Sequence, residues 1–174
     1  CIVYGDTDSV YFSAVPALPE GEKLNMDSAI KLYDHISDTV SDTFPQYLKD
    51  IFNVPKDKGA VMIAGREVVG KSGLFLTKKR YAILCLDIEG YQPEGGKLKA
   101  MGLEIKRSDT PEFIQDFLEE ILFDCLDGNT EDEVLKKIID FKEYFKNWES
   151  ENHLDSFDFV YIDKYILKNL ILIY

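Results

Sequence analysis

The sequence predicts an α+β protein in which an antiparallel sheet with packed helices is followed by a helical segment. Short runs of alternating apolar and polar residues flank a turn at the start of the chain, and further strand-like runs lie near its middle. Apolar residues recur at helical spacing in a long segment after the first turn and again in the acidic final third. This mixture of strands and helices indicates the α+β class.

The first predicted element is a β-hairpin. Residues 2–3 and 9–13 are expected to be short strands, and the "GDTD" between them consists of residue types that tolerate turn dihedrals. Two like-charged carboxylates, Asp6 and Asp8, therefore lie at the tip. A divalent cation such as Mg²⁺ relieves their repulsion because it prefers oxygen ligands. The alternative is an ordinary solvated turn, since Asp is common in turns.

A long helix is expected next, over residues 28–52, because apolar side chains recur there at helical spacing. Asn25 or Asp27 can cap its start, since a short polar side chain accepts a hydrogen bond from a free N–H of the first turn. Pro45 is expected to kink or divide the helix because proline lacks the N–H of the helical ladder.

Residues 61–69 and 80–88 are predicted strands, rich in Val, Ile, Leu and Tyr, and the glycine-containing "GKSGLFLTKK" is expected to connect them. The stretch "LKAMGLEIK" is a further extended segment. A meander is therefore expected in the middle of the chain.

The stretch "SDTPEF" predicts a helix start, with Ser108, Asp109 or Thr110 as the cap and Pro111 in the first turn. This helix is expected to end near Gly128, and a second one is expected over residues 130–148. The tail after residue 154 receives no assignment; its Asp and Lys residues argue against a membrane span, and no membrane partner is expected.

Charge is unevenly distributed along the 174 residues. The net charge of −12 argues against nucleic-acid binding by the chain as a whole, because phosphate contacts need Lys and Arg. Residues 56–107, however, contain eleven Lys or Arg against six Asp or Glu, a local net charge of +5. A basic segment thus lies within an acidic chain.

Three ordered motifs resemble one family, and the resemblance covers about residues 2–148. "YGDTDSVYF" closely resembles the signature hairpin of family B DNA polymerases, whose tip presents catalytic metal ligands. "AGREVVGKSGLFLTKKRYAILCLDIEG" is similar to the following palm segment in polymerases of T-even-like phages, and "KAMGLEIKRSDTP" to the palm-to-thumb junction. The resemblance implies that residues 1–107 are the C-terminal part of a palm with a catalytic hairpin, and residues 108–174 an incomplete helical thumb.

The resemblance also implies roles for individual residues. Asp6 and Asp8 would be the catalytic carboxylates of a two-metal Mg²⁺ site, with Asp8 the principal ligand and Asp6 a supporting neighbour. Glu67 matches a palm carboxylate near the metals. The residues that would contact primer-template DNA are Lys78, Lys79, Arg80, Tyr81, Lys106 and Arg107. The plainer alternatives are a solvated turn for the Lys-Lys-Arg triplet and a core strand position for Tyr81.

Two motifs expected of such polymerases do not occur in the sequence: a "DxxSLYP"-like segment with the other metal-binding aspartate, and a "KxxxNSxYG"-like helix that holds the dNTP. The prediction is therefore that this chain alone does not polymerise DNA. A truncated fragment and a split subunit completed by the N-terminal portion of the polymerase both remain open. The resemblance further implies a sliding clamp as a partner, and a phage protein in the cytoplasm of a bacterial host.

Two alternatives belong to other functional classes. "DTDSV" also fits the loop of haloacid-dehalogenase-like phosphatases, with Asp6 as nucleophile and Asp8 as general acid. That alternative expects a parallel sheet and a strand followed by a loop and helix, whereas the polymerase interpretation expects a hairpin. The other alternative is a non-catalytic DNA-binding subunit that uses the basic segment.

Overall fold

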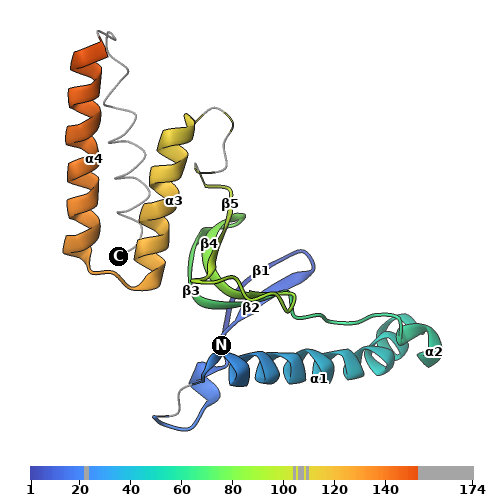
Figure 1. The fold of residues 1–174 in the computed structure, drawn as a ribbon. Coiled ribbons are helices and arrows are strands. Elements are labelled where there is room, and N and C mark those ends of the chain that lie inside the picture. Colours follow the sequence, from blue (N-terminus) through green and yellow to red (C-terminus); the bar gives the residue numbers. More distant parts are fainter. Residues whose placement is uncertain (22–23, 104, 106–107, 109, 153–174) are drawn as a thin grey trace. The chain divides into compact units, whose positions relative to one another are not determined.

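The structure is a computed structural model that describes residues 1–21, 24–103, 105, 108 and 110–152 (Figure 1). These residues form two small antiparallel sheets and four α-helices, so the predicted α+β class is confirmed. The chain divides into two compact units. The first contains residue 1 and residues 12–70 and 85–97, and the second contains residues 2–11, 71–84 and the described residues from 98 onward.

The first unit is built around one long helix, α1 (Met26–Phe52), which follows a short 3₁₀ helix, η1 (Val15–Ala17). Asn25 caps α1 as predicted, because its side chain accepts a hydrogen bond of 2.8 Å from the Ser28 N–H. Pro45 lies inside α1 and does not divide it. Proline removes one hydrogen bond of the ladder, but the helix continues through Pro45 to Phe52.

After α1 the chain turns back toward this helix through a second, short helix, α2 (Lys56–Gly59). Gly59 packs directly on α1: a Cβ at this position would lie 2.9 Å from the Cα of Pro45. Further along, the Ala64 N–H donates to Ser41 Oγ at 2.8 Å, and that hydroxyl lies 3.2 Å from the Ala64 carbonyl oxygen. The segment after α2 is therefore attached to α1.

The three-stranded sheet has the order β3 (Val68–Thr77), β4 (Arg80–Ile88), β5 (Lys97–Met101). The predicted strand over residues 80–88 is confirmed, but the one over residues 61–69 is wrong: β3 starts at Val68 and contains most of the presumed connection. Val61 and Ile63 are 82% and 77% exposed, so no neighbouring layer covers their β-branched side chains as a strand face requires.

In the second unit, β1 (Ile2–Asp6) and β2 (Ser9–Phe12) form the predicted hairpin. The loop consists of Thr7 and Asp8, and Thr7 has φ of 54°, in the left-handed region. Asp6 is thus the last residue of a strand, and Asp8 belongs to the loop itself. Two-residue hairpin loops require positive φ, which explains this conformation.

The core of the second unit lies between the sheet and two helices, α3 (Glu112–Asp127) and α4 (Glu131–Asn152). Gly128 ends α3 with φ of 103°, as predicted. The N-cap position of α3 is Pro111, without a side-chain cap, so capping by Ser108 or Thr110 is wrong; Asp109 lies outside the described residues. The buried residues of this core are Ala82, Leu84, Leu98, Leu103, Ile105, Phe117, Leu118, Ile121, Leu126, Val134, Ile138 and Phe145.

Candidate active site

The two carboxylates of the hairpin differ in their surroundings. Asp6 is partly buried, and one of its carboxylate oxygens accepts a hydrogen bond of 3.2 Å from the Thr7 hydroxyl. The Ser9 hydroxyl donates to the Asp6 main-chain carbonyl at 3.1 Å, which closes the tip. Asp8 is exposed. Within the described part of the chain, neither carboxylate forms an ion pair.

These two carboxylates suit Mg²⁺ in their chemistry, since a hard cation takes anionic oxygen ligands. They are insufficient for a two-metal centre. Among the described residues, no group of three or more His, Cys, Asp or Glu side chains is placed to hold a metal ion. A two-metal magnesium centre at the hairpin would therefore need ligands beyond Asp6 and Asp8.

Four aromatic rings pack the hairpin onto the β3–β4 turn region within the second unit. Tyr4 and Tyr11 from the hairpin meet Phe75 of β3 and Tyr81 of β4, with ring centroids 5.3–6.0 Å apart. The hydroxyls of Tyr11 and Tyr81 lie 3.2 Å apart, at hydrogen-bond distance. Aromatic contacts of this kind add stabilisation to the apolar area they bury. They attach the hairpin to the β3–β4 turn region.

The basic turn between β3 and β4 is tied to the same hairpin. The Lys79 N–H donates a hydrogen bond of 2.8 Å to the hydroxyl of Tyr4, and Lys79 has φ of 61°. Lys78 and Lys79 are exposed. Arg80 Nε donates to the Gly102 carbonyl at 3.2 Å, which attaches the turn to the chain beyond β5. The exposed lysines and the acidic hairpin are thus parts of one packed assembly.

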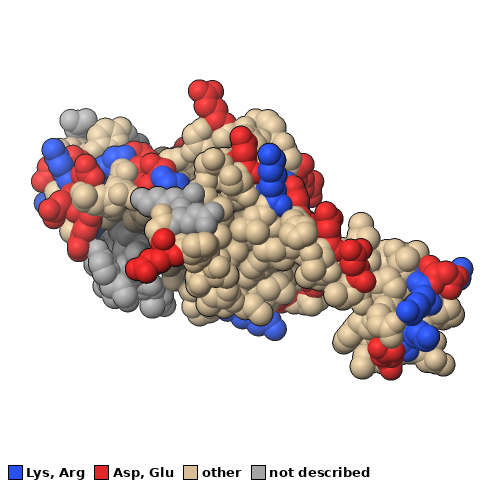
Figure 2. All heavy atoms as spheres, turned by 90° about the horizontal axis from the view of Figure 1, so that it is seen from below, with Lys and Arg blue, Asp and Glu red and all other residues tan. Residues whose placement is uncertain are grey.

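Tyr81 is 4% exposed and lies in the aromatic cluster, as the core alternative expects. Its contact with DNA stays a prediction. Lys106 and Arg107 lie outside the described residues. On the face that Figure 2 shows, Lys and Arg side chains are scattered among Asp and Glu side chains and do not form one continuous basic surface.

Glu67 belongs to the first unit, in the segment that leads into β3, and its side chain is exposed. Its main-chain carbonyl accepts a hydrogen bond of 2.8 Å from the Glu89 N–H. Glu89 and Gly90, with φ of 50° and 88°, form a two-residue turn closed by the Ile88–Tyr91 bridge. The backbone at Glu67 is therefore fixed by the turn that follows β4.

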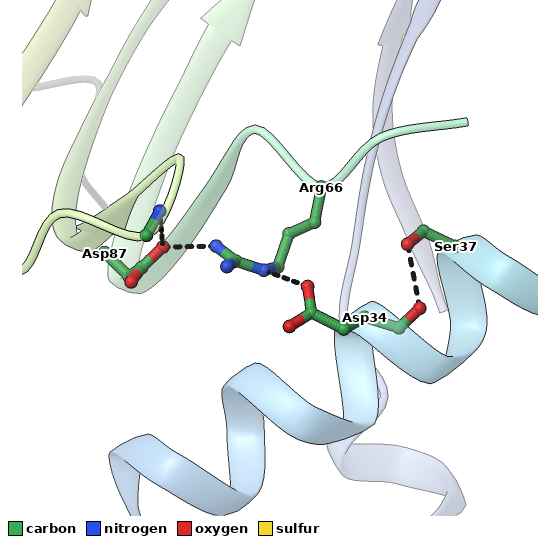
Figure 3. A network of polar contacts seen from close by, with 5 residues as sticks. Asp34, Ser37, Arg66 and Asp87 are labelled. Carbon is green, nitrogen blue, oxygen red and sulfur yellow. Dashed lines mark hydrogen bonds and ion pairs between the residues drawn. The ribbon is translucent and has the colours of Figure 1, made fainter. Parts of the chain in front are cut away.

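A network around Arg66 was not expected from the sequence (Figure 3). Its guanidinium lies between Asp34 on α1, at 2.5 Å from Nε, and Asp87 on β4, which contacts Nη1. The same Asp87 oxygen accepts from the Gly90 N–H at 3.0 Å. Burial lowers the pKa of Arg66, but the hydrogen bonds to Asp34 and Asp87 raise it more, and the net shift is upward. The sequence contains one weak indication of a buried ion pair, which is the lone Asp in the apolar run "YAILCLDI".

The topology separates two of the functional alternatives. "DTDSV" lies on a β-hairpin, and the described strands form antiparallel sheets. A phosphatase of the haloacid-dehalogenase type was expected to show a parallel sheet with a strand leading into a loop and helix. The observed arrangement is the one expected for the polymerase interpretation. Among the described helices, none combines the length and apolar character needed to cross a membrane.

Comparison with known proteins points in the same direction. The model of the family "DNA polymerase family B" matches residues 1–169. The DNA-directed DNA polymerase of Escherichia phage RB69 is 29% identical over 133 residues, which cover 70% of this chain and 15% of that protein. That of Enterobacteria phage T4 is 28% identical over 165 residues, which cover 86% of this chain and 17% of that protein. Since the family model spans nearly the whole sequence, the chain belongs to DNA polymerase family B.

Proposed function

We propose that this chain supplies one wall of the active site of a DNA-directed DNA polymerase. In the complete enzyme the 3′-hydroxyl of the primer attacks the α-phosphate of a dNTP, and pyrophosphate leaves. The observation that carries the proposal is the attachment of the basic turn to the acidic hairpin, through the Tyr4–Lys79 hydrogen bond and the four aromatic rings. It brings two carboxylates and two exposed lysines into one unit.

Asp8 and Asp6 would hold Mg²⁺, with Asp8, which is exposed in the loop, as the principal ligand that the family resemblance implies. When bound, the metals lower the pKa of the attacking hydroxyl and stabilise charge on the leaving oxygen. Glu67, which belongs to the first unit, is proposed on the family resemblance alone as a further acidic residue for metal binding. The primer-template would be contacted by Lys78, Lys79, Arg80, Tyr81, Lys106 and Arg107.

The proposal extends to the remainder of the enzyme. The chain spans only 15% and 17% of the two relatives, so a dNTP site and the opposite metal ligand would come from other parts of a polymerase. The expected partners are those parts, primer-template DNA, a dNTP and a sliding clamp, in the cytoplasm of a bacterial host. Residues 1–107 would be palm and residues 108–174 the start of the thumb.

Primer extension with Mg²⁺ tests the proposal, using the chain alone and then assembled with a polypeptide that carries the remaining parts of a related phage polymerase. Extension is expected only in the assembly. Asp8→Asn should lower it on the order of a thousandfold, because a metal that stabilises transition-state charge contributes several kcal/mol. DNA affinity of the variant should be nearly unchanged. Asp42→Asn, an exposed carboxylate on α1, is the matched control and should retain activity.

Retained extension in the Asp8→Asn assembly would overturn the catalytic assignment. An assembly that binds primer-template but never extends it, with the chain folded, would instead favour the non-catalytic DNA-binding subunit. Salt-dependent DNA binding alone does not separate these two alternatives, because both use the same basic residues.

A further inference from the structure

The basic turn between β3 and β4 contains a strained lysine. Lys78 and Lys79 form the two-residue loop between Thr77 and Arg80, and Lys79 has φ of 61°. Glycine adopts this left-handed conformation readily, whereas a residue with a side chain adopts it at a cost. Such strain persists where neighbouring groups enforce it, and it is concentrated at functional sites. The contacts of the Lys79 backbone are therefore informative.

Two main-chain contacts restrain Lys79, one on each side of its Cα. Its N–H, which belongs to the preceding peptide group, donates to the Tyr4 hydroxyl at 2.8 Å. Its carbonyl, which belongs to the following peptide group, packs so closely on Gly102 that a Cβ at Gly102 would overlap the carbonyl oxygen. Holding both peptide groups fixes the direction in which the Lys79 side chain leaves the backbone. All three residues belong to the second unit.

The hydroxyl of Tyr4 has a role that can be separated from the packing of its ring. The ring stacks on Phe75 with centroids 5.3 Å apart and lies 5.6 Å from that of Tyr81, and a phenylalanine ring could make the same contacts. The hydroxyl alone reaches the basic turn. Tyr4 also belongs to β1, the strand that ends at Asp6, so this one hydrogen bond links the acidic hairpin to Lys79.

We propose that Tyr4 is a positioning residue whose hydroxyl holds Lys79 in the direction in which its ammonium group binds a DNA phosphate. The inference rests on the proposed function, because it takes Lys79 as a DNA contact, and it assigns no contact between Tyr4 and DNA. A flexible lysine reaches a phosphate from many backbone positions. A change of φ from positive to negative, however, moves Cβ to another side of the turn, from which the same phosphate is harder to reach.

The test measures how the affinity of the assembled polymerase for primer-template changes with salt. Lys79→Gln should reduce the slope of log affinity against log salt by about 1, since one phosphate contact is lost. Tyr4→Phe removes no charge, yet it should reduce the slope toward the same value. It should also weaken binding by about three- to tenfold, the effect of one hydrogen bond. The double variant should bind no more weakly than Lys79→Gln, because both substitutions act through one contact.

Tyr33→Phe is the matched control. The Tyr33 hydroxyl also accepts from a main-chain N–H, that of Ala14 at 3.1 Å, but in the first unit. Its loss should leave the salt slope unchanged. Gly102→Ala displaces the Lys79 carbonyl from the opposite side and should reduce the slope, so it tests the inference even where Tyr4→Phe fails to fold.

A second readout does not depend on DNA. Amide hydrogen exchange of the β3–β4 turn in the assembled polymerase, followed by mass spectrometry, should be faster in Tyr4→Phe, because the Lys79 N–H loses its acceptor. Exchange in the same peptide should be unchanged in Tyr33→Phe. Urea unfolding of each variant reports any loss of fold.

The outcomes distinguish the positioning role from the function on which it rests. A folded Tyr4→Phe variant that keeps the full salt slope, with or without faster exchange in the turn, would show a structural role only and overturn the inference. An unchanged slope in Lys79→Gln, with extension still lost in Asp8→Asn, would also overturn it while leaving the catalytic proposal intact. Extension retained in Asp8→Asn would remove the proposed function itself.

Discussion

Gly102 packs directly against Lys79 and Arg80 of the basic turn between β3 and β4. Its φ is 64°, and a Cβ placed there would overlap the Lys79 carbonyl oxygen and approach Arg80 Cγ to 3.1 Å. Its own carbonyl accepts the hydrogen bond from Arg80 Nε. A side chain at this position would therefore both strain the backbone and displace the turn.

Gly102→Ala should destabilise the chain by about 1–3 kcal/mol, because it combines a left-handed backbone with a main-chain clash. Urea unfolding followed by circular dichroism measures the effect. Gly95→Ala is the matched control: its φ is also positive, at 73°, but nothing lies within 4 Å of the added methyl group. Equal losses in the two variants would mean that backbone strain, and not contact with Lys79, dominates.

Tyr81 shows why the roles of single residues were hard to predict. In the sequence it follows three cationic residues, and the resemblance marks all four as DNA contacts. The structure places Tyr81 in an aromatic cluster that supports the hairpin, with its hydroxyl near that of Tyr11. Because Tyr11 lies 70 residues away in the chain, local pattern could not reveal this packing.

At the scale of the element, a capping box formed by Thr130 and Glu133 stabilises the start of α4. The Thr130 N–H and hydroxyl both donate to Glu133 Oε2, at 2.9 and 2.8 Å, and the Glu133 N–H lies 3.4 Å from the Thr130 hydroxyl oxygen. These hydrogen bonds, first that from the Thr130 N–H, lower the pKa of Glu133. Two otherwise free donors at the helix start are satisfied.

This cap should make helix stability depend on pH. A lowered folded-state pKa stabilises the chain above the ordinary carboxyl pKa of about 4.3, and the gain disappears as pH falls through the folded value. Glu133→Gln should therefore lower the urea midpoint at neutral pH and lose this effect in acid, since only the ionised group is favoured. Glu143→Gln, on an exposed part of the same helix, should show no such trend. A pH-independent difference for Glu133→Gln would contradict the explanation.

Element boundaries were best predicted where a local signal exists. Asn25 caps the start of α1 through its own side chain, and Gly128 ends α3 through its own backbone conformation. Both helix ends were predicted at these residues. Residues 61–69 carry β-branched side chains but form no strand before Val68, because strand formation needs a partner across the sheet. Glycines inside β3 concealed the strand that does pair with β4.

At the scale of the whole molecule, the net charge is unfavourable for DNA binding. The chain carries a net charge of −12, and Lys and Arg side chains on the face in Figure 2 are dispersed. The net negative charge repels DNA at long range, so binding at the basic turn would rely on short-range contacts from exposed cations such as Lys78 and Lys79.

Replacing both lysines by glutamine should reduce the slope of log affinity against log salt by about 2, since each lost phosphate contact removes roughly one counterion. Salt titrations of primer-template binding by the assembled polymerase measure the slope. Lys136→Gln with Lys146→Gln makes the same change in net charge on exposed positions of α4 and is the control. A similar loss in both pairs would indicate a general charge effect and no contact at the turn.

By itself, the sequence determined the α+β class, the acidic hairpin and the family, because turn residues, periodicity and ordered motifs are local properties of the chain. Only the tertiary structure decided how the functional residues are supported. The Tyr4–Lys79 hydrogen bond and the Arg66 network each join residues distant in the chain. Such contacts depend on which elements pack together, and packing is set by burial over the whole fold, which no short stretch of sequence encodes.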